Sequence, residues 1–413
     1  MKDVLFQYNP WWEQNVILKD IIPRKKYMDI LKFNLTNEQI IFLTGLRRIG
    51  KTTLLKLLAQ ELIREGIPAK NILYVSLDDY IFKKYTILEI LNEYRKTHKL
   101  PIEKKVYLLF DEVIYKKDFH QQLKNIFDRQ NTKIFATSSS SIKLKDTKAF
   151  LTGRSYIIEV NPLTFEEYLD FKNIVILQRD RELLEPYFID FIQSGGIPYN
   201  VLKNERDYIT GLIDDIIYKD IIAEHGIKNP LMIKDYFLLL MERSGEQLSI
   251  NKIANILKIS VDSSKKYLSY FNDTFLIHLL SRHGKTNEKI LSPKKIYCSD
   301  LGIKFNFTGL RDLGSYFENY IYLKLRHNDI YYLYEDGMEI DFYIKNTNSL
   351  IESKFNSKMN EKQKQLFESF KAKERLVIDS VENLKILKKF ERIENGIDKG
   401  LYNNQLGQTK PLS

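Results

Sequence analysis

The loop from Gly45 to Thr53 constrains the fold of this chain more than any other feature, because it combines two glycines, a lysine and two threonines. An apolar run, Ile40–Leu43, precedes the loop, and a run rich in leucine, residues 54–58, follows it. A glycine-containing turn between a buried strand and a helix exposes backbone N–H groups that can bind phosphate. The pattern predicts a nucleoside triphosphate site.

Within this loop the residue types suggest separate roles. Lys51 can reach the terminal phosphates of ATP, and the Thr52 hydroxyl can bind magnesium. We therefore predict ATP and Mg²⁺ as ligands. The residues predicted to hold the nucleotide are Gly45, Arg47, Arg48, Ile49, Gly50, Lys51, Thr52 and Thr53.

A second apolar run, Val106–Phe110, ends in two acids, Asp111 and Glu112. Such a run fits a buried parallel strand, and ligands bind at the carboxyl edge of an open α/β sheet. We expect Asp111 to contact the magnesium-bound water and Glu112 to polarise the attacking water. The alternative is an acidic pair that only closes a strand at the surface.

A third apolar strand, Lys133–Thr137, leads into a serine run that begins at Ser138. Ser138 and Ser139 are candidates to contact the γ-phosphate or the water, although serine runs also form plain loops. Arg154 is either an arginine finger for transition-state charge or a solvated arginine.

Composition narrows the class of protein. A chain of 413 residues predicts two to three domains, and a net charge of +10 favours an anionic partner, with nucleic acid first. The single cysteine, Cys298, excludes an internal disulfide and a cysteine-based zinc site, and it indicates a reducing compartment. No apolar run approaches the roughly 20 residues of a membrane span, and no signal-peptide pattern is present. We expect a cytoplasmic protein without a membrane partner.

The order of strand and helix patterns predicts an α/β chain of four domains. Residues 1–162 alternate strands with helices, which indicates a P-loop NTPase parallel sheet. Residues 163–230 are predicted as a helical lid or connector, residues 231–308 as a winged helix-turn-helix, and residues 309–413 as a restriction-endonuclease-like α/β domain.

The predicted winged helix consists of helices at 248–257 and 261–271, followed by a two-stranded wing. We assign the wing to 275–277, 282–289 and 294–297. The exposed face of the second helix carries Asp262, Ser263, Lys265, Lys266 and Tyr270. This face either contacts a phosphate backbone or packs on a protein surface.

Carboxylates are also predicted to converge near the end of the chain. Asp341 lies in a predicted hairpin, and Glu352 and Lys354 share one face of the next strand because strand side chains alternate. Two carboxylates can hold Mg²⁺ or Mn²⁺, a lysine can position the attacking water, and Glu318 on an upstream helix can add a ligand. This order is that of the PD-(D/E)xK nuclease superfamily. The alternative is a nuclease-like fold kept for binding or packing.

The chain as a whole resembles the prokaryotic AAA-type ATPases that carry a C-terminal domain of unknown function. The resemblance rests on segments 45–53, 108–112, 137–141, 151–154, 195–198, 317–319 and 352–354. It implies a P-loop ATPase joined to a winged helix and a nuclease-like domain, with ATP and magnesium as ligands. One departure is at Thr137-Ser138-Ser139, where a glycine before the serines is more usual, and it leaves the sensor hydroxyl open.

These patterns predict an ATPase that engages DNA, with metal-dependent cleavage as a further activity of the C-terminal domain. The first alternative is a nucleotide-dependent switch that acts on a protein partner and has a catalytically silent nuclease-like domain. The second is a DNA-binding ATPase without cleavage. In a homo-oligomer, Arg154 would serve either its own site or that of a neighbouring copy.

Overall fold

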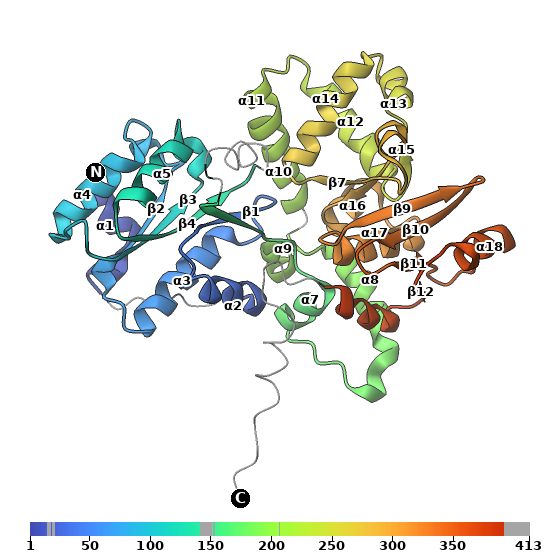
Figure 1. Ribbon diagram of the computed structural model, residues 1–413, viewed down its shortest axis with the longest axis horizontal. Helices are drawn as coiled ribbons and strands as arrows, with labels where there is room; N and C mark the ends of the chain where they lie inside the picture. Colours follow the sequence, from blue (N-terminus) through green and yellow to red (C-terminus); the bar gives the residue numbers. More distant parts are fainter. Residues whose placement is uncertain (15–17, 19–20, 141–150, 152, 206, 392–413) are drawn as a thin grey trace, which may run out of the picture. The chain divides into compact units, whose positions relative to one another are not determined.

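The computed structural model describes residues 1–14, 18, 21–140, 151, 153–205 and 207–391 (Figure 1). These residues form two compact units, each built from several stretches of the chain. Unit 1 takes its described residues from Met1–Val175, Ser194–Phe237 and Ile259–Ile277, and unit 2 takes them from Ile176–Gln193, Leu238–Lys258 and the chain from His278 onward. The domain borders expected at 162, 230 and 308 stay predictions.

Unit 1 is built on a five-stranded parallel sheet with the spatial order β2-β3-β4-β1-β5. The strands are β1 (Ile40–Thr44), β2 (Ile72–Ser76), β3 (Val106–Asp111), β4 (Thr132–Ser138) and β5 (Ser155–Glu159). Every residue of β1 and β3 is buried, as expected for apolar runs that are covered on both faces. The predicted parallel α/β sheet is confirmed.

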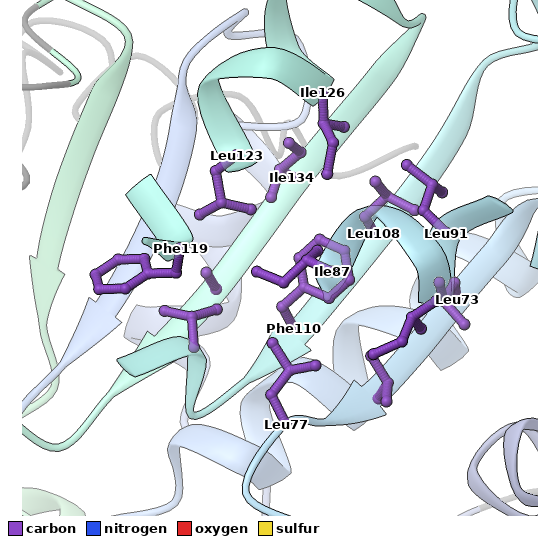
Figure 2. Close-up of a cluster of buried hydrophobic side chains, with 14 of the residues drawn as sticks. Leu73, Leu77, Ile87, Leu91, Leu108, Phe110, Phe119, Leu123, Ile126 and Ile134 are labelled. Atoms are coloured by element: carbon purple, nitrogen blue, oxygen red, sulfur yellow. The ribbon is translucent and has the colours of Figure 1, made fainter. Parts of the chain in front are cut away.

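Helices cover both faces of this sheet. On one face, α1 (Lys2–Tyr8), α4 (Ile87–His98) and α5 (Phe119–Arg129) pack on alternate strand residues in one apolar cluster. Figure 2 shows Leu91 of α4 beside Leu108 of β3, and Leu123 of α5 beside Ile134 of β4. On the other face, α3 (Lys51–Arg64) contacts β2, β3 and β4, and α2 (Lys25–Phe33) packs on α3. The helix that follows the phosphate-binding loop is therefore fixed against three strands.

Strand β2 lies at an edge of the sheet, and side chains of the N-terminal segment close that edge. Asn9 is fully buried, donates from Nδ2 to the carbonyl oxygen of Tyr74 (2.8 Å), and accepts at Oδ1 from the Tyr74 N–H (2.6 Å). Trp12 donates from Nε1 to the carbonyl oxygen of Ile72 (2.9 Å). These contacts satisfy backbone groups that an open edge would leave free to pair with another strand.

The rest of unit 1 is mainly helical, as predicted for residues after 163. The Leu163 N–H donates to the Gly196 carbonyl oxygen (2.7 Å). A Cβ at Gly196 would lie 2.4 Å from the Leu163 oxygen, so only glycine permits this approach. The helices are α7 (Phe165–Phe171), α9 (Pro198–Lys203), α10 (Tyr208–Asp215), α11 (Ala223–His225) and α14 (Val261–Asp273). Shorter segments are η1 (Pro10–Trp12), η2 (Ala69–Asn71), η3 (Tyr80–Phe82), η4 (Val113–Tyr115) and the π-helical η6 (Ile216–Ile222).

Unit 2 contains a four-stranded sheet with the order β12-β11-β10-β9. Its strands are β9 (Ile330–Glu335), β10 (Met338–Ile344), β11 (Ser349–Ser353) and β12 (Glu374–Ile378). The first three are antiparallel and β12 runs parallel to β11. Asp336 and Gly337, with φ of 48° and 77°, form the tight turn between β9 and β10, which is the hairpin predicted around Asp341. Helix α17 (Leu313–Leu325) contacts β11, and α18 (Glu361–Ser369) contacts β10.

A three-stranded sheet with the order β6-β8-β7 contains β6 (Gln247–Leu248), β8 (Lys294–Cys298) and β7 (Ile277–Leu280). Helix α13 (Ile250–Leu257), capped by Ser249, and α14 confirm the two predicted helices. The prediction that 282–289 belongs to a wing strand is wrong, because Thr286–Leu291 forms helix α15 and Glu288 accepts the Lys285 N–H at its start. Since α13 and α14 lie in different units, a winged helix stays a prediction.

The remaining elements are α8 (Leu184–Ser194), α12 (Pro230–Glu242), α16 (Leu301–Thr308), η5 (Gln178–Leu183) and η7 (Glu382–Phe390). Within the described ranges, no helix has both the length and the apolar character needed to cross a membrane.

Replacing Asn9 by alanine should destabilise unit 1 by about 1–3 kcal/mol, because the N–H and carbonyl groups of Tyr74 lose buried partners. Urea unfolding can be followed by tryptophan fluorescence, since both tryptophans of the chain, Trp11 and Trp12, lie beside this edge. Gln7→Ala, at an exposed position in the same segment, is the matched control. Equal midpoints for the two variants would contradict the proposed role of Asn9.

Candidate functional site

The loop between β1 and α3 has the backbone geometry expected of a phosphate-binding turn. Gly45 has a φ of 132°, and a Cβ there would lie 2.3 Å from the Val160 carbonyl oxygen. Gly50 has a φ of 96° and stands directly before the first residue of α3. Both positions therefore require glycine, and the first turn of α3 directs its backbone N–H groups toward the loop.

Lys51 is the first residue of α3, and its side chain is buried beneath the loop. Its ammonium group donates to the carbonyl oxygens of Gly45 (2.9 Å) and Leu46 (3.0 Å). Burial lowers the pKa of Lys51, against the attraction of Glu112 and Asp111. Phosphate oxygens are stronger acceptors than these neutral carbonyls, so the lysine can exchange one set for the other.

Asp111 ends β3 and receives three hydroxyl groups. Thr52 Oγ1 donates to its Oδ2 (2.7 Å), Tyr74 donates to the same oxygen (3.0 Å), and Thr137 donates to Oδ1. Thr52 and Asp111 are thus brought together as predicted. Hydroxyl and carboxylate oxygens are the ligand types that magnesium prefers, so this pair fits the ion that the resemblance implies.

Glu112 follows Asp111 with a φ of 52°, in the left-handed region. Its Oε2 accepts from the backbone N–H (3.2 Å) and the hydroxyl (3.1 Å) of Ser139, and its own N–H donates to Thr137 Oγ1 (2.8 Å). Burial raises the pKa of Glu112, Lys51 opposes this shift, and Asp111 adds to it. A carboxylate held in this way can accept a proton from water.

Of the two candidate serines, only Ser139 is placed at the acids by a described contact. The Ser138 hydroxyl donates to the Ser140 carbonyl oxygen (2.9 Å) and so belongs to the local turn. Ser141, the last residue of the serine run, and Thr152 lie outside the described residues. The sequence interpretation missed Thr137, which contacts both acids. Its position at the end of a strand beside β3 was the available signal.

Arg154 lies at the amino end of the parallel strands, whereas the loop lies at their carboxyl end. Its carbonyl oxygen accepts the N–H of Ile40, the first residue of β1, whereas the loop follows the last residue of β1. Its guanidinium pairs with Asp128 (2.9 Å). Arg154 therefore does not contribute to the site of its own chain, and a role at a neighbouring copy stays a prediction.

The two loop arginines pair with acids of the helical part of unit 1. Arg47 Nε lies 2.5 Å from Oδ2 of Asp220 in η6, and Arg47 Nη2 donates to Asp220 Oδ1 (2.6 Å). Arg48 makes a longer contact of 3.8 Å with Asp215. Asp220 had no pattern in the sequence that singled it out. The loop is thus tied to η6 by an ion pair that includes one hydrogen bond, from Arg47 Nη2.

A cavity of about 540 Å³ adjoins these groups. It is lined by the loop, by Asp111 and Glu112, and by five tyrosines that could contact a base or sugar, namely Tyr8, Tyr74, Tyr115, Tyr199 and Tyr208. The loop residues in the lining are Arg47, Arg48, Gly50, Lys51, Thr52 and Thr53. Ile49 is fully buried instead and supports the loop from within.

In unit 2 the predicted C-terminal residues also converge. The Asp341 N–H on β10 donates to Glu352 Oε2 on β11 (3.0 Å), and Lys354 Nζ lies 2.7 Å from Glu352 Oε1. Burial, followed by Asp341, raises the pKa of Glu352, and Lys354 opposes the shift. The same effects, with Lys295 opposing, raise the pKa of Glu318 on α17.

Lys295 of β8, which the sequence interpretation missed, lies among these acids. Its ammonium group contacts Glu318 Oε1 (2.7 Å), Glu339 Oε1 (2.6 Å) and Asp341 Oδ1 (3.3 Å). Burial alone would lower the pKa of Lys295, and the surrounding carboxylates outweigh burial and raise it. Across the part of the chain that the structure describes, no three His, Cys, Asp or Glu residues are grouped so that they could hold a metal ion. The arrangement at Lys295 does not fit the predicted metal site.

Comparison with protein families agrees with the geometry of unit 1. Residues 37–169 match a family model described as an AAA domain, and residues 185–313 match one described as a domain of unknown function, DUF8612. The chain therefore contains an AAA-type P-loop ATPase domain.

Two of the relatives are described as uncharacterized proteins. MJ1544 of Methanocaldococcus jannaschii is 32% identical over 275 residues, which cover 62% of this chain and 62% of that protein. A protein of Haemophilus influenzae is 25% identical over 349 residues, which cover 81% of this chain and 86% of that protein. The chain thus spans less than two thirds of the M. jannaschii relative.

Among solved structures, AMPPCP-bound DnaA from Aquifex aeolicus is 18% identical and aligns over 64% of this chain and 91% of that chain, with a TM-score of 0.28. Saccharomyces cerevisiae Hsp104 in a casein complex is 20% identical and aligns over 58% of this chain and 48% of that chain, with a TM-score of 0.31. These scores are too low to establish a common fold. The AAA assignment rests on the family model and the loop.

The Arg47–Asp220 pair should show a coupling energy of about 1 kcal/mol, the upper end for partly exposed pairs, in a double-mutant cycle of Arg47→Ala and Asp220→Ala. Both side chains are about four fifths buried, which limits screening by solvent. The free energy of unfolding in urea is the measurement. The longer and more exposed Arg48–Asp215 pair is the matched control and should give a smaller value. Equal coupling in the two cycles would argue against a specific link between loop and η6.

Proposed function

We propose that the chain binds ATP with Mg²⁺ at the β1–α3 loop and hydrolyses it. The observation that carries this proposal is the meeting of Lys51, Thr52, Asp111 and Glu112 at the carboxyl edge of three neighbouring strands. Each of these residues was expected there from the sequence. The AAA-domain match of residues 37–169 supports the proposal independently.

In this mechanism the loop N–H groups and Lys51 bind the β- and γ-phosphates. Thr52 and Asp111 supply oxygens for Mg²⁺, which offsets phosphate charge when bound. Glu112, held by Ser139, accepts a proton from the attacking water. The water oxygen bonds to the γ-phosphorus as the bond to the β–γ bridging oxygen breaks, and ADP and phosphate leave.

We further propose that nucleotide state is coupled to DNA engagement. The proposal is supported by the net charge of +10 and by α14, where Lys265 and Lys266 are exposed while Leu268 is buried. Tyr270, another member of that face, stacks on His225 with ring centroids 3.7 Å apart. Lys265 makes only a long contact of 4.0 Å with the exposed Asp262, so both lysines can meet phosphates, whereas Tyr270 has a structural role.

The second candidate function is a nucleotide-dependent switch that acts on a protein partner, with a catalytically silent nuclease-like domain. The order of unit 2, with α17, β9, β10, β11, α18 and β12, supports a nuclease-like topology. The contact of Lys295 with three acids favours a silent site. We therefore propose ATP hydrolysis without metal-dependent DNA cleavage by unit 2.

Lys51→Ala should abolish ATP hydrolysis, because it removes the ammonium group that lies beneath the loop at the Gly45 and Leu46 carbonyl oxygens. Glu112→Gln should bind ATP near the wild-type affinity but lose at least about 100-fold in turnover, in the range of general-base catalysis. Phosphate release measures turnover, and fluorescence of a labelled ATP analogue measures binding. Lys124→Ala, an exposed lysine on α5, is the control. Wild-type turnover in Lys51→Ala would rule out this site.

If DNA contacts the exposed lysines of α14, its affinity should fall steeply with salt, because each phosphate contact releases counterions. Fluorescence anisotropy of labelled linear, branched and single-stranded DNA between low and physiological salt provides the slope. Lys265→Ala with Lys266→Ala should reduce that slope by about 2, or about 1 per lysine. Lys83→Ala with Lys84→Ala, two exposed lysines beside η3, is the control. Absence of DNA binding would favour the protein-partner switch.

A further inference from the structure

We propose that Lys295 is the resident cation of the carboxylate cluster in unit 2, so that a side chain takes the place of a divalent metal ion. The cluster is formed by Glu318, Glu339 and Asp341. This proposal concerns unit 2 alone and holds whether or not unit 1 hydrolyses ATP.

The geometry at Lys295 matches the donors of an ammonium group to the acceptors around it. The side chain is 1% exposed, and an ammonium group has three N–H donors and no acceptor. Three carboxylates, from α17 and β10, lie within 3.3 Å of Nζ. A buried charge requires such partners. Here the three N–H donors of the ammonium group match three carboxylate oxygens, one from each acid.

The cluster is held in place from the other side by further contacts. Gln247 pairs with Lys295 in the register of β6 and β8, and its Nε2 donates to Glu339 Oε2 (2.7 Å). Tyr297, two residues along β8 on the same face, donates to Glu318 Oε1 (2.8 Å). The β6–β8 pair therefore carries Lys295 and also donates hydrogen bonds to two of its acids, Glu339 and Glu318.

The carboxylate oxygens of Asp341 and Glu352, two of the three metal ligands predicted in unit 2, are also already used. Asp341 accepts from Lys295 at Oδ1 and from the Ser353 N–H at Oδ2 (3.0 Å). Glu352 accepts from Lys354 and Gln363 at Oε1 and from the Asp341 N–H at Oε2. All four carboxylate oxygens thus have a protein donor, and a metal ion would have to displace several of them.

The charge of Lys295 also opposes the entry of a divalent ion. A cation entering between Glu318 and Asp341 would lie beside an ammonium group from which burial excludes water. Removing that ammonium while leaving the acids should open the cluster to Mg²⁺ or Mn²⁺, since hard carboxylate oxygens then lack their cation. The inference therefore predicts a gain of metal binding on loss of one lysine.

The test is a titration of the full chain with Mn²⁺ in the absence of nucleotide. Electron paramagnetic resonance measures the free Mn²⁺ and so gives the number of bound equivalents. Lys295→Met, which keeps the length of the side chain, should bind one more equivalent of Mn²⁺ than wild type. Its affinity for this equivalent should be at least tenfold higher than that of the wild-type cluster. Adding Asp341→Asn to Lys295→Met should remove the gain. The melting temperature of Lys295→Met should also rise with Mn²⁺, while that of wild type should not.

If Lys295→Met fails to fold, Lys295→Met with Glu339→Gln removes one charge of each sign and retains Glu318 and Asp341. This second variant should show the same gain of one equivalent. A wild-type Mn²⁺ equivalent that disappears in Asp341→Asn would overturn the proposal. A folded variant without Lys295 that gains no Mn²⁺ would overturn it as well.

Discussion

The parallel register of β1, β3 and β4 is the constraint on which the nucleotide site depends. It brings the end of β1, where the loop begins, beside the end of β4, and the end of β4 beside the acids that close β3. Thr137 of β4 joins the two acids that close β3, because its hydroxyl accepts from the Glu112 N–H and donates to Asp111. A shift of either strand by one residue would turn Thr137 to the opposite face and separate the two acids from their common partner.

Two buried lysines in this chain show how the surroundings of the same group set its use. Lys51 donates to neutral carbonyl oxygens, and its pKa is lowered, so it is available to an incoming anion. Lys295 donates to three carboxylates, and its pKa is raised, so its charge is already matched. The first arrangement suits a ligand that arrives and leaves. The second suits a permanent part of the structure.

The sequence predicted what local patterns encode. The loop, the strand that ends in Asp111, the β9–β10 turn and the Glu352–Lys354 pair all lie in short segments with their own periodicity. It did not predict Lys295, which lies 23 residues before Glu318 and 46 before Asp341, because only the packing of β8 against α17 and β10 joins them. The wing expected at 282–289 failed because Glu288 caps helix α15 instead. Arg154 lies at the amino end of the parallel strands because it directly precedes β5, which runs in the same direction as β1.

The Arg47–Asp220 pair has a consequence for how unit 1 responds to its ligand. A phosphate near the loop and the carboxylate of Asp220 compete for the same guanidinium. By thermodynamic linkage the two effects are reciprocal. A change that weakens the Arg47–Asp220 pair raises the affinity of Arg47 for phosphate, and a bound phosphate weakens the Arg47–Asp220 pair by the same factor. Because Asp220 lies in the π-helical η6, phosphate binding at the loop and the packing of this helix are linked.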